Sequence, residues 1–203
     1  MSNSIENLGG YVCTPYLHDH DSIELKDSWV SSKNVESLYF VTATFSDDTK
    51  PYFSTSSNHY ILAKFVNTEK ISKEILSHPN EKPSFLFKIN NSIFERPMIE
   101  KTNFISIYYL EYGDSKSELR DVSVQLARRE KIQQAGFGNL TLLSKEAPKF
   151  EFPFSDHIVM LEVSSDKSHQ SDNKYCEQTR RDIVRKGIVM NNLVSLSILE
   201  TMK

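Results

Sequence analysis

A serine, an aspartate and a histidine form the first group of residues that could do chemistry. Gly113-Asp114-Ser115 follows a predicted strand and opens a predicted helix, and Asp166 and His169 lie further along the chain. A serine nucleophile, a histidine base and an aspartate that orients the histidine together catalyse acyl transfer. In this interpretation Ser115 is the nucleophile, His169 is the base and Asp166 orients it, so the protein would be a small hydrolase.

These blocks, with Gly138-Asn139 between them, resemble the GDS-type lipases and esterases, the SGNH hydrolases. That family places several parallel βαβ crossovers, each of about 30 residues, between its serine and its histidine. The interval from Ser115 to His169 is too short for them. Ser115-Lys116-Ser117-Glu118 is also a helix capping box. We therefore predict that Ser115 caps a helix, that the chain has no catalytic residues and that it is not an enzyme. The hydrolase stays as an alternative.

Two histidines, His18 and His20, are spaced as on a strand, so that both could face one metal ion. His59 or Cys13 would have to supply a third ligand, and nothing in the sequence places either of them nearby. The segment 18–21 fits a solvated loop as well as a metal site. We predict no metal and no cofactor, and leave the histidine pair open.

Arginines gather on two predicted helices: Arg120, Arg128 and Arg129 on the first, and Arg180, Arg181 and Arg185 on the second. Arginine binds carboxylates and phosphates bidentately, which suits an acidic protein partner or an RNA backbone. Acidic residues alternate with the arginines, which is typical of a solvated, salt-bridged helix face. The net charge of −3 provides no overall basic field. A nucleic-acid-binding module that uses these arginines is an alternative, but we do not expect nucleic acid as the partner.

The composition is that of a folded protein. The 203 residues include 11% aromatics, whereas disordered chains are poor in them. The two cysteines, Cys13 and Cys176, indicate reduced thiols rather than a disulfide framework. Residues 1–10 lack the cationic and apolar blocks of a signal peptide, and no apolar run approaches the roughly 18 residues that span a bilayer. We expect a soluble cytoplasmic protein without membrane insertion.

Apolar periodicity and turn residues predict the elements that must position these side chains. We expect a loose N-terminal arm over residues 1–35, with one short strand near Tyr11, and a single domain over residues 36–203, with no internal repeat. The fold class is α+β, with a mainly antiparallel sheet packed by about three helices. Strands are predicted at 38–45, 60–66, 85–89, 92–99, 104–112, 140–143 and within 150–163. Asn90-Asn91 is a plausible hairpin turn. Helices are predicted at 68–76, 117–135 and from 175 to the end.

The C-terminal segment 175–203 carries more apolar side chains than one helix stripe needs. On a helix, one stripe contains Cys176, Ile183, Met190, Val194 and Ile198. A second stripe contains Ile188, Val189, Leu196 and Leu199. A helix that is apolar on two sides is sandwiched between two surfaces. We predict that the first stripe docks on the domain and that the second binds a protein partner, together with Arg128, Arg129, Arg181 and Arg185. The alternative is a hairpin that turns at Asn191-Asn192.

After residue 67 the predicted element order is α-βββ-α-ββ-α. This order resembles the class I chaperones of type III secretion systems, which are small cytosolic adaptors that bind an unfolded segment of a secreted protein. The resemblance implies a non-catalytic role in protein binding. We therefore predict a non-catalytic adaptor or chaperone-like subunit of a cytoplasmic hetero-complex, which binds its protein partner through the C-terminal helix and the sheet.

Overall fold

The structure is a computed structural model of the whole chain. It describes residues 8–47, 49–50, 58–67, 84–95, 101–111, 122, 124–126, 131–143, 150–151, 158–164, 177–178, 181–182 and 188–203. Statements below refer to these residues. Among them, no helix is long and apolar enough to cross a membrane.

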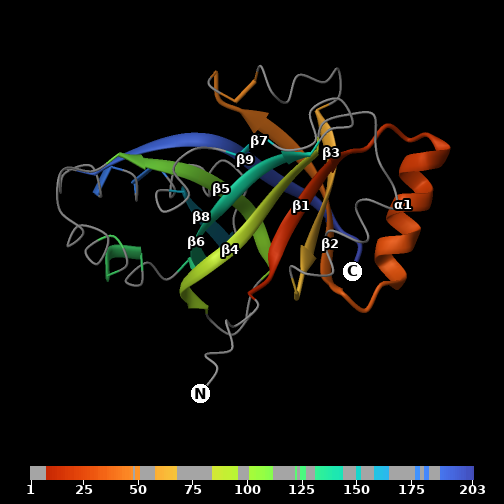
Figure 1. Cartoon of the computed structure of the whole chain (residues 1–203), viewed down its shortest axis with the longest axis horizontal. Coiled ribbons are helices and arrows are strands. Elements are labelled where there is room, and N and C mark those ends of the chain that lie inside the picture. Colours follow the sequence, from red (N-terminus) through yellow and green to blue (C-terminus); the bar gives the residue numbers. More distant parts are fainter. Residues whose placement is uncertain are drawn as a thin grey trace.

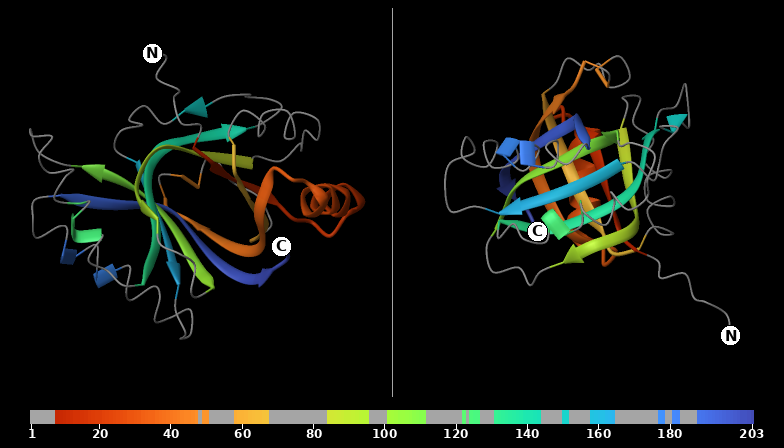
Figure 2. Two further views of the ribbon diagram at one scale, coloured as in Figure 1. Left: turned by 90° about the horizontal axis from the view of Figure 1, so that it is seen from below. Right: turned by 90° about the vertical axis from the view of Figure 1, so that its left-hand side faces the viewer.

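Eight antiparallel strands form a closed ring (Figures 1 and 2). Around the ring the order is β4-β1-β3-β2-β9-β5-β8-β6, and the pairing of β4 with β6 closes it. The strands are β1 (Gly10–Pro15), β2 (Val35–Phe45), β3 (His59–Phe65), β4 (Ser84–Glu95), β5 (Thr102–Glu111), β6 (Ile132–Leu143), β8 (Ile158–Ser164) and β9 (Val189–Thr201). The short β7 (Phe150–Glu151) extends the sheet from β6. An eight-stranded barrel has an interior that side chains can fill.

Alternating residues of the strands fill the interior. Tyr11 and Cys13 of β1, Leu62 of β3, Ile107 of β5 and Met160 of β8 belong to one buried cluster. The residues between them face outward, where they form two further apolar clusters on the outside of the barrel. Both faces of most strands are therefore buried, which explains why many strands lack the apolar–polar alternation of a sheet with one solvated face.

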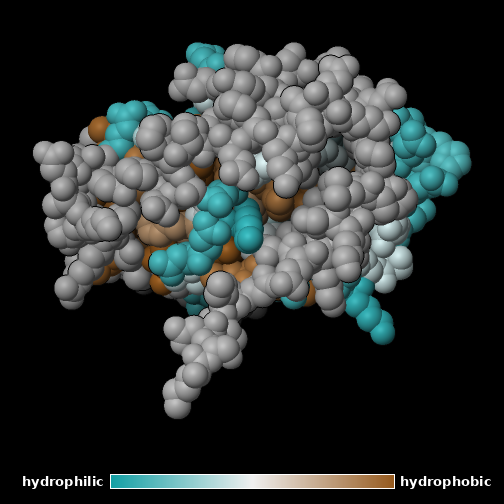
Figure 3. Space-filling model, viewed as in Figure 1, coloured by the Kyte–Doolittle hydropathy of each residue, from teal (hydrophilic) through white to brown (hydrophobic). Residues whose placement is uncertain are grey.

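Helix α1 (His20–Ser31) covers one outer cluster. Asp19 caps it by accepting a hydrogen bond from the Ser22 backbone N–H at 2.8 Å. Leu25 and Trp29 are buried against outward residues of the first three strands. The opposite face of the helix is hydrophilic and lies at the right-hand edge of Figure 3. The short strand expected near Tyr11 is the barrel strand β1, whereas residues 20–31, which we expected in a loose arm, form the helix that covers it.

The predicted α+β fold with about three helices is wrong. The described part of the chain is a closed antiparallel barrel, in which α1 is accompanied by short helical stretches at residues 122, 124–126, 177–178 and 181–182. The helix predicted over 117–135 cannot reach its expected end, because β6 begins at Ile132. The strands predicted at 85–89 and 92–99 are one strand, β4, and Asn90 lies at a β-bulge instead of a hairpin turn. The helix predicted over 68–76 lies outside the described residues.

The predicted C-terminal helix is also wrong. Residues 189–201 form β9, which is hydrogen-bonded to β2 on one edge and to β5 on the other. Val194, Leu196 and Ile198 all point into the barrel interior. An apolar segment with both faces buried has no single clear period, so the pattern fits a helix as well as a strand. The strand of the hairpin alternative was therefore nearer the structure, although β9 runs on through Asn191 and Asn192 without a turn.

The barrel consists of two halves with the same topology. The first half has the order β4-β1-β3-β2, and the second has β9-β5-β8-β6. If the four strands of each half are numbered in chain order, their order across the sheet is 4-1-3-2 in both halves. This is the arrangement of the split βαβ unit. The halves join through two equivalent seams, in which β2 pairs with β9 and β6 pairs with β4. The structure therefore contains an internal repeat that the sequence did not reveal.

Two β-bulges lie at matching places in the two halves. In β2 the extra residue is Glu36, opposite Lys64, and in β6 it is Gln133, opposite Glu162. The seams also have bulges at matching places, with Leu199 of β9 as the extra residue in one seam and Asn90 of β4 in the other. The β4–β6 seam has a second extra residue, Ile93. These pairings place Lys64 of β3 and Glu162 of β8 at equivalent positions, and likewise Tyr11 of β1 and Ile105 of β5.

Candidate functional site

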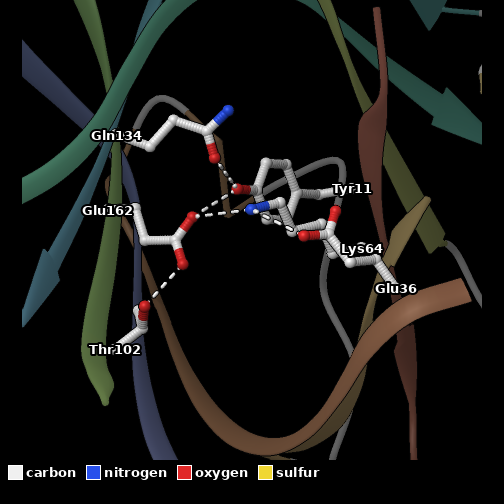
Figure 4. Close-up of polar contacts among 6 residues, drawn as sticks. All are labelled: Tyr11, Glu36, Lys64, Thr102, Gln134 and Glu162. Carbon is white, nitrogen blue, oxygen red and sulfur yellow. Dashed lines mark hydrogen bonds and ion pairs between the residues drawn. The ribbon is translucent and has the colours of Figure 1, made fainter. Parts of the chain in front are cut away.

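A buried carboxylate in the barrel interior gathers polar side chains from both halves (Figure 4). Glu162 of β8 is only 1% exposed. Its Oε2 accepts a hydrogen bond from the Tyr11 hydroxyl at 2.6 Å, and its Oε1 accepts one from the Thr102 hydroxyl at 2.5 Å. The Lys64 ammonium lies 3.5 Å from Oε2. We call Tyr11, Glu36, Lys64, Thr102, Gln134 and Glu162 the Glu162 cluster.

The repeat explains how these groups meet. Lys64 and Glu162 occupy equivalent positions in the two halves, so their strands bring them to the middle of the barrel from opposite sides. Two identical halves would place like charges there, which would repel each other in a medium of low dielectric constant. This chain instead has a cation in one half and an anion in the other. Tyr11 pairs with Lys64 in the first half, and the aliphatic Ile105 holds the equivalent position opposite Glu162 in the second half.

Tyr11 keeps its proton near neutral pH. Burial, together with the negative charge of Glu162 and its hydrogen bond, holds the pKa of Tyr11 well above its ordinary value. The Tyr11 oxygen also lies 3.1 Å from the side-chain amide of Gln134. One hydroxyl donates one proton, and the carboxylate is the stronger acceptor. The Gln134 amide completes the arrangement when its NH2 group is turned toward the Tyr11 oxygen, because the two ends of an amide are interchangeable by a flip.

Lys64 connects the interior to the surface. Burial acts to lower its pKa, but the charges of Glu162 and then Glu36 outweigh that effect, and the pKa of Lys64 is raised. The Lys64 side chain is 8% exposed, while Glu36, at 3.9 Å from the same ammonium, is 44% exposed. Lys64 Nζ also lies 5.9 Å from the centre of the Tyr11 ring. The cluster thus has a buried carboxylate, two protonated donors and a carboxylate open to solvent.

Burial in the barrel interior also raises the pKa values of two neighbouring residues, Tyr39 and Cys13. Burial, and then the charge of Glu162, raises the pKa of Tyr39. Burial raises the pKa of the Cys13 thiol well above its ordinary value. A protonated, buried thiol is a poor nucleophile and a poor metal ligand. Cys13 is therefore part of the interior packing.

The residues predicted to bind a partner do not share one surface. Leu196 points into the barrel and Ile188 is buried in an outer cluster, whereas Val189 and Leu199 are 40% and 48% exposed. Arg181 lies in a short helical stretch. Arg128, Arg129 and Arg185 lie outside the described residues, as do Ser115, Asp166 and His169 of the hydrolase alternative.

The two histidines considered for a metal are not directed to one point. His18 packs edge-on against Tyr16, with ring centres 4.4 Å apart, whereas His20 lies on α1, 3.5 Å from Glu24. Of the expected third ligands, His59 stacks on Phe40 and Cys13 is inside the barrel. The ligand atoms of His20, Asp21 and Glu24 do lie within 4.8 Å of one another, but all three residues are exposed.

The Glu162 cluster escaped the sequence analysis, although a signal was present. Lys64 and Glu162 are single charges inside apolar strands, at positions that alternate with buried residues. Such charges face the interior together with their apolar neighbours. That reasoning finds each residue, but it does not show that Lys64 meets Glu162, because their contact depends on how the two halves join.

Comparison with known proteins finds remote likeness to solved structures. No family model matches the chain, and no curated protein matches it. A crystal structure of a Fusobacterium nucleatum protein, provisionally described as a monooxygenase, is similar over 95% of this chain and 92% of its own, with 11% sequence identity and a TM-score of 0.44. A likeness this remote assigns no activity to the chain.

Two functional predictions are corrected. The non-catalytic adaptor or chaperone-like subunit is wrong, because the helix that was to dock its partner is the barrel strand β9. The prediction that the chain is not an enzyme is wrong with it. It depended on the lack of clustered reactive groups, and the Glu162 cluster is such a group.

Proposed function

We propose that the chain is an enzyme whose reactive centre is the Glu162 cluster and whose chemistry is proton transfer on a small carbonyl compound. One observation carries the proposal. A buried carboxylate, a phenol and an ammonium from distant parts of the chain converge in the barrel interior, at 2.6 and 3.5 Å. Clusters of ionisable groups whose pKa values are shifted by burial and by a specific charged partner are typical of active sites.

Stability alone is a weak reason to keep such a cluster. Removing two charges from water is costly, and apolar residues of similar volume often stabilise a protein as well as a buried ion pair does. Many residues of the barrel interior are apolar or aromatic, so such a replacement would fit these neighbours. Departures from the apolar pattern in a core are expected mainly at functional sites.

The arrangement suits a substrate that develops negative charge on oxygen. The raised pKa leaves Lys64 protonated at neutral pH, and an ammonium has three N–H donors, so Lys64 can face both carboxylates and still donate a hydrogen bond to a carbonyl oxygen. A fixed donor of this kind stabilises the oxyanion that forms in the transition state. Tyr11 donates its single proton to Glu162 and helps to position it. Glu162 and Thr102 act as positioning residues, since Glu162 holds Lys64 and Thr102 holds Glu162.

The reaction needs a base near the carbon of the substrate, and Glu36 is the solvent-open carboxylate of the cluster. A C–H proton next to the carbonyl passes to Glu36, and the C–H electron pair becomes part of the enolate. The Lys64 ammonium holds the enolate oxygen. Return of the proton to carbon gives the exchanged or isomerised product, with no change in oxidation state. We retain a cytoplasmic location within this proposal, which the free, buried thiol of Cys13 supports.

Deuterium exchange tests the proposal without knowledge of the natural substrate. The protein is incubated in D2O with a panel of ketones, α-keto acids and thioesters, and loss of the proton signals next to the carbonyl is followed by NMR. We expect exchange for at least one class, and a 10²–10⁴-fold lower rate for Glu36→Gln, which is the usual contribution of a general base. Lys33→Met, at an exposed lysine outside the cluster, is the control for Lys64→Met. Exchange that is absent throughout the panel, or unchanged in Glu36→Gln and Lys64→Met, would refute the proposal.

A further inference from the structure

A groove on the outside of the barrel is separate from the Glu162 cluster. It has a volume of about 520 Å³ and lies between α1 and the outer face of β2 and the end of β9. Such a volume is within the range of small-molecule sites, which is about 300–1,000 Å³. Its walls include Tyr16, His18 and Phe40, together with Lys26, Asp27 and Glu200.

Three rings of the groove are set at steep angles to one another. The planes of Tyr16 and His18 meet at 77°, those of Tyr16 and Phe40 at 81°, and those of His18 and Phe40 at 68°. The ring centres are 4.4, 5.6 and 6.1 Å apart. His59 stacks on Phe40 at 5.4 Å and fixes its orientation. Rings packed in this way hold one another in fixed orientations along the groove wall.

The backbone at His18 has an unusual conformation that supports this arrangement. Among the described residues other than glycine, His18 alone has a positive φ, at 57°. The left-handed region is uncommon for such residues, and conformations of this kind cluster at ligand-binding sites. Here the conformation stands immediately before the cap of α1 and accompanies the packing of the His18 ring against Tyr16.

The charges of the groove favour a cation. Asp27 and Glu200 are exposed carboxylates, and Lys26 lies 3.5 Å from Asp27. The Lys26–Asp27 pair is nearly neutral, so Glu200 leaves the groove with an excess of negative charge. The face of an aromatic ring is also electrostatically negative. Cations are attracted to such faces, and a quaternary ammonium group is the type of ligand that walls of several rings recognise.

We propose that this groove binds a small organic cation of the alkylammonium class. The cationic head lies against the ring faces of Tyr16 and Phe40, and Glu200 supplies the nearest opposite charge. Val30 of α1 and Met202 add apolar surface at the sides of the groove, which suits methyl groups on the nitrogen. The ligand is therefore recognised by its charge and its methyl groups together.

Choline and its neutral carbon analogue, 3,3-dimethylbutan-1-ol, test the proposal because they share a shape and differ in charge. Each is titrated into the whole protein while the ring resonances of Tyr16, His18 and Phe40 are followed by NMR. We expect saturable shifts with choline, and far weaker shifts with the neutral analogue. Phe40→Leu should raise the Kd for choline by about 2- to 30-fold, as expected from the range of cation–π energies. Glu200→Gln should raise it by about 1.4- to 5-fold, as expected for the loss of an exposed opposite charge. Glu24→Gln, an exposed carboxylate on α1 that does not line the groove, should leave it unchanged.

Three results would overturn the proposal: no shifts with choline, equal binding of the neutral analogue, or equal Kd values for the wild type and Glu200→Gln. If Phe40→Leu fails to fold, Glu200→Gln still decides the question, because Glu200 is exposed. Lys26→Ala provides a second measurement. It removes a positive charge from the groove wall and should tighten choline binding; weaker binding in this variant would also contradict a cation site.

Discussion

Lys64 Nζ lies 3.5 Å from Glu162 Oε2, although the two residues hold the same position in opposite halves of the barrel. This contact joins β3 to β8, two strands that are not neighbours in the sheet. The pair is nearly inaccessible to solvent, so its energetics differ from those of a surface ion pair.

The first prediction concerns the stability of this pair. Glu162→Gln and Lys64→Met should each lower the free energy of unfolding by about 3–5 kcal/mol, because each leaves a buried charge without its partner. The double variant has no unpaired charge and should recover most of that loss. Urea unfolding measures all three. Lys26→Met, in the exposed Lys26–Asp27 pair, should cost less than about 1 kcal/mol. Additive losses in the double variant would show that the two charges do not interact.

The second prediction is a loss of stability in alkali. The ordinary pKa values are 10.0 for tyrosine and 10.5 for lysine, and both Tyr11 and Lys64 are raised above them. Above those ordinary values the unfolded chain releases protons that the folded chain retains, so the free energy of unfolding falls as pH rises. The contribution is fully present below pH 10. Urea unfolding between pH 8 and pH 11.5 should show the decline, with a smaller slope in Tyr11→Phe and in Lys64→Met. An equal slope in these variants would contradict the assignment.

The sequence predicted several strands well and missed the elements around them. Dense β-branched and aromatic residues located β2, β3 and β5 to within a few residues. Helix α1 was missed because polar residues surround its few buried ones, Leu25 and Trp29. Strand β9 was mistaken for a helix because the barrel buries residues on both of its faces. In each case, tertiary packing decided what local periodicity left open.

The candidate site was harder to predict for a physical reason. Glu162 is recognisable as an inward charge in an apolar strand, but its partners Tyr11, Lys64 and Thr102 come from β1, β3 and β5. Their convergence depends on the order of strands around the ring and on the bulges that set their register. Neither is encoded in any short motif.

The third prediction concerns the β4–β6 pairing that closes the ring. A Cβ at Gly138 would overlap the backbone carbonyl of Lys88, which cannot move without breaking the pairing. Gly138→Ala should therefore destabilise the protein by about 1–3 kcal/mol, the usual cost of overpacking, or more. Gly136→Ala is the matched control, since its Cβ would lie 3.1 Å from the Ile89 Cγ2 atom, which belongs to a side chain. Thermal unfolding compares the two, and equal midpoints would contradict the prediction.

The fourth prediction follows from the repeat. The chain can be divided between β4 and β5 into two fragments, residues 1–98 and residues 99–203. The two fragments should associate when they are produced together, because the β2–β9 and β4–β6 pairings both connect a strand of one fragment to a strand of the other. Each fragment alone should pair poorly with itself. Self-pairing would bring Lys64 against Lys64, or Glu162 against Glu162, and buried like charges repel.

Size-exclusion chromatography with mass spectrometry distinguishes the mixed pair from the self-pairs. Lys64→Met in the first fragment should make its self-pairing easier and so reduce the preference for the mixed pair. If wild-type fragments form self-pairs and mixed pairs in statistical proportion, the opposed charges do not direct the assembly.

The opposed charges of the two halves also make the two sides of the interior different. A barrel of two identical halves would present the same surroundings to both faces of a molecule lying on its axis. In this chain the ammonium of Lys64 and the carboxylate of Glu162 mark the two sides, and the phenol of Tyr11 in one half has the aliphatic Ile105 as its counterpart in the other. A flat enolate bound there would meet its proton from one direction. Any new stereocentre formed in this interior should therefore appear as a single enantiomer.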